Sequence, residues 1–175
     1  MERMEEHVVR ADDQALQYML TESHWDSKAF MNQVAQKANL LLGGDESCLL
    51  LDESGFEKKG EHSVGVARQW IGRLGKADNC QVGVFAALGR GSRATLIDFR
   101  LYLPERWSKE EQRCEKSGIP ESCRHFKIKS ELALEMVRHQ RQQGIHFAWV
   151  GADGGYGKEP RYIQVRYTDQ PGRCV

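Results

Sequence analysis

Long apolar runs are absent from this sequence of 175 residues. No segment approaches the roughly 20 consecutive apolar residues of a membrane-spanning helix, and the acidic opening MERMEEHVVRADD lacks the apolar stretch of a secretory signal. We therefore expect a protein that stays in the cytoplasm and has no membrane partner. Neither G-x-G-x-x-G nor G-x-x-x-x-G-K-[ST] occurs among the glycines of residues 55–76, which argues against a nucleotide-binding loop.

Paired cysteine spacings are also missing. The five cysteines are an odd number and include no C-x-x-C, and the histidines show no mutual metal spacing. We therefore expect free thiols rather than a zinc site or a disulfide framework.

Charge of one sign does not dominate the whole chain, but it does dominate parts of it. Residues 1–53 hold eleven acids against four bases, which leaves −7 there and, because the net charge is zero, +7 in the remainder. This asymmetry is compatible with a nucleic-acid-facing surface on the later part of the chain. With 40% hydrophobic and 29% charged residues, the composition is typical of a globular α/β or α+β domain.

Helical periodicity occurs in three segments. Apolar residues three or four positions apart predict helices over residues 11–20, 26–43 and 130–144. The first two helices make up an N-terminal helical segment, which we place at residues 1–46. The polar stretch 104–128 is expected to be a loop that includes a single helical turn.

Shorter apolar runs predict four strands, over residues 47–52, 80–88, 94–103 and 146–150. The middle two are separated by Gly89-Arg90-Gly91-Ser92, which favours a hairpin. The first and the last are unbroken apolar runs, which is typical of strands that are buried on both faces. The helix before the last strand would cross back over the sheet, so the sheet is expected to be mixed.

Aspartates flank the first and the last of these predicted strands. Asp52 ends the first run, and Asp153 follows the last. If the two strands are parallel neighbours, both carboxylates lie at the same edge of the sheet, where they could hold Mg²⁺ together with a phosphate. Aspartate beside glycine is also ordinary turn chemistry, so that alternative stays open. Glu53 should point to the opposite side and face solvent, and it is the fallback ligand if the strand register differs by one residue.

A basic stretch follows the first aspartate. Residues 55–76 contain five bases against the two acids Glu57 and Glu61. The bases are Lys58, Lys59, Arg68, Arg73 and Lys76. Contacts between such side chains and phosphates would give DNA a salt-sensitive, sequence-independent affinity. Trp70 in this stretch could stack on an exposed base, although packing is the commoner use of tryptophan, and we expect a structural role for Trp149.

Four stretches resemble insertion-sequence transposases of the superfamily named for its Asp, Asp and Glu catalytic acids. They are ALQYMLTESHWD (15–26), LLLDESGFEKKGEHSVGVARQWIGRLGKADNCQVGVFAAL (49–88), DFRLYLPERW (98–107) and VGADGGYG (150–157). The resemblance implies a ribonuclease-H-like catalytic core over residues 47–175, with the first acid at Asp52 and the second at Asp153. It also implies a two-metal Mg²⁺ site, binding to the element's terminal inverted repeats, and cleavage and joining of DNA ends. Whether the intact protein forms a homo-oligomer stays open.

The superfamily's third acid has no counterpart in this sequence. That acid is a glutamate on a helix well beyond the second aspartate, whereas the acids after Asp153 are Glu159 and Asp169, neither of which lies in a convincing helix. We therefore expect that the C-terminal part of the fold is missing and that the metal site is incomplete in this polypeptide alone. The alternative functions are a remnant that binds DNA or a transposase without cutting, and an unproductive remnant.

Overall fold

The computed structural model describes residues 12–24, 26–153 and 156. The chain divides into two compact units, Met1–Phe30 and Met31–Val175. In the first unit, helix α2 (Asp13–Thr21) is capped by Asp12, whose side chain accepts a hydrogen bond from the Ala15 N–H at 2.7 Å. Helix α3 (Ser27–Leu42) begins in the first unit and continues into the second. Both predicted N-terminal helices are confirmed, while the boundary between residues 46 and 47 stays a prediction.

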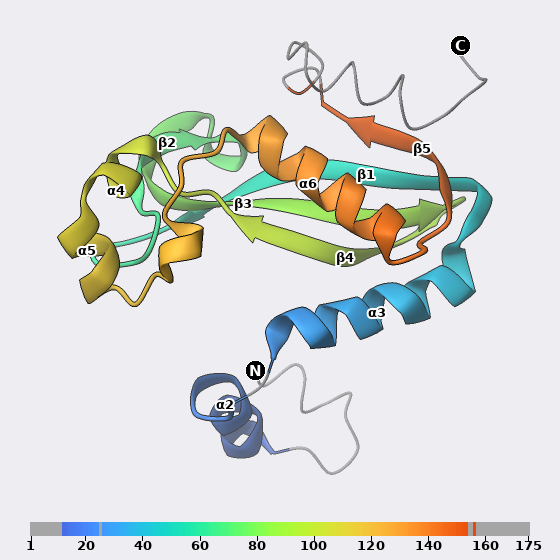
Figure 1. Ribbon diagram of the computed structural model, residues 1–175, viewed down its shortest axis with the longest axis horizontal. Coiled ribbons are helices and arrows are strands. Elements are labelled where there is room, and N and C mark those ends of the chain that lie inside the picture. Colours follow the sequence, from blue (N-terminus) through green and yellow to red (C-terminus); the bar gives the residue numbers. More distant parts are fainter. Residues whose placement is uncertain (1–11, 25, 154–155, 157–175) are drawn as a thin grey trace. The chain divides into compact units, whose positions relative to one another are not determined.

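A five-stranded mixed sheet forms the centre of the second unit (Figure 1). The strands are β1 (Gly44–Glu57), β2 (Ala67–Ile71), β3 (Lys76–Arg90), β4 (Arg93–Leu101) and β5 (Phe147–Ala152). Strand β3 pairs antiparallel with β1, and it also pairs antiparallel with β2 along its first part and with β4 along its second part. Strand β5 pairs parallel with β1. The predicted hairpin and mixed sheet are confirmed, whereas β2 lies in a segment for which the sequence predicts no strand.

Helix α6 (Lys129–Gln142) precedes β5 and lies across one face of the sheet (Figure 1). Its predicted apolar stripe is buried, with Leu132 7% and Met136 0% exposed. The helix is followed by Gly144, whose φ of +75° is the left-handed conformation that glycine adopts without strain. Buried Gln140 donates through Nε2 to Oδ2 of Asp98 on β4 at 3.0 Å, and this bond fixes the helix to the sheet.

The main hydrophobic core lies between the sheet and helices α3 and α6. Strand β1 contributes Leu49 and Leu51, which are 0% and 3% exposed. The neighbouring side chains face the other way, and Leu50 of β1 and Trp149 of β5 are 44% and 55% exposed. The prediction that these two strands are buried on both faces is therefore wrong, because among the described residues the main core covers one face of β1 and β5 and leaves Leu50 and Trp149 exposed.

Two short helices, α4 (Glu105–Lys109) and α5 (Glu111–Lys116), occupy the stretch predicted to be a loop with one helical turn. A 3-10 turn, Glu121–Cys123, follows them. Trp107 explains why this polar stretch folds, since its ring is fully buried and its Nε1–H donates to the Val66 carbonyl at 2.8 Å. A second, smaller core surrounds it, formed by Val66, Leu103, Cys114 and Ile119. This cluster anchors the segment that leads into β2.

The order of elements agrees with a ribonuclease-H-like α/β arrangement. Strands β1, β3 and β4 are antiparallel neighbours, helix α6 follows, and β5 returns parallel to β1, with β2 inserted between β1 and β3 in the sequence. The predicted fold class is thus confirmed. Across residues 12–24 and 26–153, no helix is long and apolar enough to span a membrane. Glu159 and Asp169, the acids considered for the third position, lie outside the described residues.

Candidate functional site

Asp52 lies within β1 rather than at its end. The strand continues to Glu57 because β3 is long enough to pair with it as far as Glu57↔Cys80. The parallel pairing with β5 is shorter, and its last partners are Leu51 and Ala152. The predicted strand end is therefore wrong for β1 itself. Asp52 instead marks the point at which β1 loses its parallel neighbour.

Asp153 directly follows the last residue of β5. Because Leu51 and Ala152 are partners, Asp52 and Asp153 are the next residues along two adjacent parallel strands. Both side chains are exposed. Within the described part of the chain, Asp52 forms no ion pair, and its Oδ1 accepts a hydrogen bond from the Glu53 N–H at 2.7 Å. The structure thus brings the two predicted aspartates to neighbouring positions.

The two aspartates offer the donor type that a hard divalent cation takes, since carboxylate oxygens are the usual protein ligands of Mg²⁺. In residues 12–24, 26–153 and 156, no group of three histidine, cysteine, aspartate or glutamate side chains converges to hold a metal ion. The described residues therefore provide two carboxylates and not a full set of protein ligands. Such a partial set fits Mg²⁺, which is usually bound through one or two carboxylates together with waters and substrate phosphate.

Glu53 faces the opposite side of β1 from Asp52, but it is not the solvent group that the sequence predicts. Its Oε1 accepts from Nζ of Lys129 at 2.7 Å, and its side chain is only 32% exposed. The hydroxyl of Tyr156 donates to the other oxygen, Oε2, at 3.5 Å. Both carboxylate oxygens are therefore engaged with other side chains, which makes Glu53 a poor alternative ligand.

Tyr156 follows the second aspartate by three residues and is buried, with 4% of its surface exposed. Its backbone N–H donates to the Asp153 carbonyl at 3.2 Å. Burial raises the pKa of its hydroxyl well above the ordinary value, and the negative charges of Glu53, Asp153 and Asp52 raise it further. The hydroxyl therefore stays protonated at neutral pH. A tyrosine in a glycine-rich sequence gives no signal for this burial, because such sequences are often solvated.

Lys129 is a second residue of this site that the sequence does not identify. It is the first residue of α6, where the helix dipole disfavours a cation. That mismatch is a signal which could have pointed to an acidic partner. The partner itself could not be found in this way, because Glu53 lies 76 positions away in the sequence.

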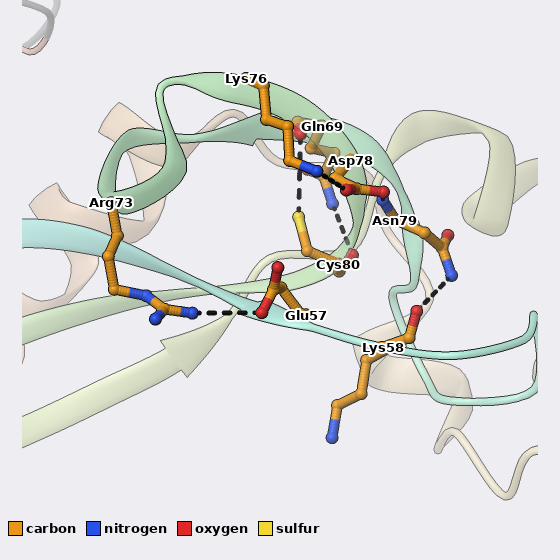
Figure 2. A network of polar contacts seen from close by, with 8 residues as sticks. All are labelled: Glu57, Lys58, Gln69, Arg73, Lys76, Asp78, Asn79 and Cys80. Atoms are coloured by element: carbon orange, nitrogen blue, oxygen red, sulfur yellow. Dashed lines mark hydrogen bonds and ion pairs between the residues drawn. The ribbon is translucent and has the colours of Figure 1, made fainter.

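The arm, by which we mean residues 57–80, carries the predicted basic stretch (Figure 2). Arg73 pairs with Glu57 at 3.3 Å, and Lys76 pairs with Asp78 at 2.7 Å. Asn79 ties the arm together, since its Nδ2 donates to the carbonyls of Lys58 at 2.8 Å and of Gly60 at 2.7 Å. Two of the five predicted bases are thus neutralised by acids of the arm itself.

Three predicted bases remain without an ion pair among the described residues, namely Lys58, Lys59 and Arg68. Arg68 is exposed on β2, and Trp70, two residues further along the same strand, is 62% exposed. Ala67 and Ile71 at the ends of the strand are buried. Of the uses considered for Trp70, packing in the core is excluded, because the side chains of this five-residue strand alternate and Trp70 falls on the outward side.

Comparison with known proteins identifies a family and a curated relative. The model of the family described as DDE superfamily endonuclease matches residues 1–167. The probable transposase for insertion sequence element IS701 from Microchaete diplosiphon is 31% identical over 160 residues. The match covers 88% of this chain but only 38% of the relative, so the chain spans less than two fifths of that protein's length. No solved structure matches the chain.

Proposed function

This chain belongs to the DDE superfamily endonucleases, in the DDE transposase family, and from that premise we propose that Asp52 and Asp153 are two acids of a catalytic metal site. The proposed activity is the cleavage and strand transfer of DNA at the ends of an insertion sequence. The observation that carries the assignment is the parallel pairing of β1 with β5, whose last partners are Leu51 and Ala152. Asp52 and Asp153 are the residues that directly follow these two partners.

Endonucleases of this superfamily are generally dependent on divalent metal ions, and we propose Mg²⁺ as the ion. Asp52 and Asp153 would hold it through carboxylate oxygens, the ligand type that Mg²⁺ prefers. Once bound, two such ions would stabilise the attacking and leaving oxygens of the phosphodiester. Asp52 suits this role because, within the described residues, no base neutralises its charge.

The two proposed ligands lie at different places relative to the strands. Asp52 lies inside β1 and its backbone is paired with Phe85 of β3, while the pairing of β1 with β5 ends one residue before it. Asp153 is the first residue after β5, which ends at Ala152. A metal site requires both carboxylates to be placed accurately, so contacts other than strand pairing matter for the position of Asp153.

DNA is the proposed partner, and the element's terminal inverted repeats are the proposed sequence. Three bases of the arm have no ion pair among the described residues: Lys59 and Arg68, which are exposed, and Lys58, which is half-buried. They are suited to phosphate contacts that fix the position of the duplex without reading its sequence. Arg73 and Lys76 are less available because Glu57 and Asp78 already pair with them. Trp70, two residues after Arg68 on β2, is exposed and is available to stack on an unpaired base.

A second candidate function is DNA binding without cleavage. The site assigned above contains two of the three acids that give the superfamily its name, and the described residues hold no third acid that completes a metal cluster with them. We therefore expect the 175-residue chain by itself to bind DNA through the arm but to carry out little or no strand transfer. Strand transfer by this chain alone would contradict that expectation.

The test of the proposed site compares two substitutions in a transposase polypeptide that carries this segment and cuts its element's ends. Asp52→Asn and Asp153→Asn remove a charge at constant size, and each is expected to reduce cleavage on the order of a thousandfold, since metal-borne charge stabilisation is worth several kcal/mol. Asp45→Asn is the matched control, because Asp45 lies on the same strand with a side chain that is 93% exposed. We expect the control to cut normally.

The same variants should also be examined for folding and for metal affinity. Far-ultraviolet circular dichroism and thermal unfolding are expected to match the wild type, because both side chains are exposed. Affinity for Mg²⁺ or Mn²⁺ is expected to fall in both variants and not in the control. Normal cleavage by either Asp52→Asn or Asp153→Asn would remove that residue from the metal site.

A further inference from the structure

We propose that Tyr156, Glu53 and Lys129 form a positioning group that holds Asp153 beside Asp52. This inference rests on the proposed function, because it explains how the second ligand is kept in place. The three residues come from separate elements of the second unit: Glu53 from β1, Lys129 from the start of α6, and Tyr156 from the segment after β5.

Glu53 is the centre of the group, since each of its two oxygens accepts from a different element. Lys129 Nζ donates to Oε1 at 2.7 Å, and the Tyr156 hydroxyl donates to Oε2 at 3.5 Å. The Lys129 and Glu53 side chains are 29% and 32% exposed, so water screens their attraction less than it screens that of a surface pair. Strand β1, which carries Asp52, is thereby connected to both α6 and the chain beyond Asp153.

Tyr156 transmits this connection to the second aspartate. Its ring packs in the main core and is 4% exposed, so moving it would expose a large apolar surface. Its backbone N–H donates to the Asp153 carbonyl at 3.2 Å. The buried Tyr156 ring therefore anchors a backbone group to which Asp153 is hydrogen-bonded, just beyond the end of β5 at Ala152.

Lys129 orients the Glu53 carboxylate toward Tyr156. A lysine at the first position of a helix is unfavourable on its own, because the helix dipole repels a cation there. Its ammonium also lies 5.5 Å from the centre of the Tyr102 ring, which accommodates the positive charge. Glu53 and Tyr102 together offset the unfavourable position, and the ammonium in turn keeps Glu53 on the helix-covered side of β1, away from Asp52.

The group does not touch the proposed ion, so its residues are positioning residues. Substitution of residues that hydrogen-bond to metal ligands without touching the metal typically lowers metal affinity on the order of 10–100-fold. A purely structural tyrosine or ion pair would change stability but not metal affinity. Metal affinity is therefore the measurement that separates the two roles.

The experiment measures Mn²⁺ binding to the full 175-residue chain by electron paramagnetic resonance, with thermal unfolding measured in parallel. Tyr156→Phe keeps the ring and removes the hydroxyl, and Lys129→Met keeps the aliphatic stem and removes the charge. Each is expected to weaken Mn²⁺ binding on the order of tenfold. Lys129→Arg, which keeps the charge, is expected to restore most of the affinity. Tyr102→Phe is the control: it keeps the ring beside Lys129, has no bond to Glu53, and should bind as the wild type does.

The results distinguish this inference from the function on which it rests. If binding requires Asp52 and Asp153 but Tyr156→Phe and Lys129→Met bind Mn²⁺ as tightly as the wild type, the positioning role is overturned and the metal site survives. If the wild type and Asp52→Asn bind Mn²⁺ equally, the metal site itself fails and the positioning role fails with it. Weaker binding in Tyr156→Phe and Lys129→Met, with rescue by Lys129→Arg, supports both.

Discussion

The arm and the aspartate site both contain several acids but neutralise them differently. The aspartate site consists of Asp52, Glu53, Lys129, Asp153 and Tyr156. In the arm, Glu57 and Asp78 are each paired with a base that is also part of the arm. In the aspartate site, Glu53 is paired with Lys129, whereas its neighbour Asp52 has no ion pair among the described residues. Adjacent residues of one strand thus have opposite electrostatic roles.

This difference separates acids that stabilise the protein from an acid that is available to a ligand. A paired acid cancels a neighbouring charge and holds two elements together, while an exposed, unpaired acid keeps its full charge for a cation from solution. The same reasoning divides the bases of the arm: Arg73 and Lys76 are used internally, and Lys58, Lys59 and Arg68 remain for an anion. The predictions below test this division, beginning with the largest expected effect.

Removal of the three unpaired bases of the arm should weaken DNA binding strongly. A plot of log affinity against log salt concentration has a negative slope, and the triple variant Lys58→Ala, Lys59→Ala, Arg68→Ala is expected to make it shallower. The slope should lose roughly 0.9 in magnitude for each phosphate that the protein no longer neutralises. Fluorescence anisotropy with a duplex at several salt concentrations measures this slope. The charge-matched control replaces three exposed bases elsewhere, Lys37, Arg93 and Lys116. Equal slopes for the two triple variants would show that the arm is not the DNA-binding surface.

The half-buried Lys129–Glu53 pair should contribute more to the free energy of unfolding than the exposed Arg73–Glu57 pair does. Glu53→Gln leaves Lys129 without its partner at a position that is only 29% exposed, so we expect a loss of about 1–2 kcal/mol in the free energy of unfolding. Glu57→Gln breaks a pair whose side chains are 70% and 51% exposed, and we expect less than about 0.5 kcal/mol. Urea unfolding of the two variants gives the comparison directly. Equal losses would mean that the burial of the Glu53 pair has no energetic consequence.

The smallest expected effect is the pH dependence of the Lys76–Asp78 pair. The hydrogen bond from Lys76, followed by the bond from the Asn79 N–H, lowers the pKa of Asp78, and the bond to Asp78 raises the pKa of Lys76. Because the folded pKa of Asp78 lies below the ordinary value, the pair's stabilisation is fully present above the ordinary aspartate pKa and is lost as the pH falls through the lowered one.

A carboxyl-detected NMR titration checks this prediction. The midpoint for Asp78 is expected to rise toward the ordinary aspartate value in Lys76→Met, because the main cause of the lowered pKa is then removed. An unchanged midpoint in that variant would show that the pair does not form in solution.

Local patterns predict most of the second unit but not its less regular parts. Helices α3 and α6, the β3–β4 hairpin and strand β5 have apolar residues at regular spacing, which is visible without knowledge of the fold. Strand β2 was not predictable in this way, because its exposed Arg68 and Trp70 interrupt the apolar positions and its order comes from pairing with β3. The two short helices α4 and α5 depend similarly on the burial of one residue, Trp107.

The proposed metal site shows the same limit. Asp52 and Asp153 could be chosen from the sequence, because each flanks an apolar run and lies in a stretch that resembles the superfamily. Their adjacency required the register of β1 with β5, which no local pattern contains. The roles of Glu53, Lys129 and Tyr156 were also hidden, since Glu53 is separated from Lys129 by 76 positions and from Tyr156 by 103.

The central claim is that Asp52 and Asp153 share a divalent ion, and crystals of the chain soaked in Mn²⁺ would test it most directly. Anomalous diffraction locates Mn²⁺ without any assumption about activity, and Mn²⁺ takes the same carboxylate ligands as Mg²⁺. The predicted result is a peak coordinated by carboxylate oxygens of both aspartates, with Glu53 still bonded to Lys129. A peak bound by Glu53 instead, or carboxylates of Asp52 and Asp153 too far apart to touch one ion, would contradict the account.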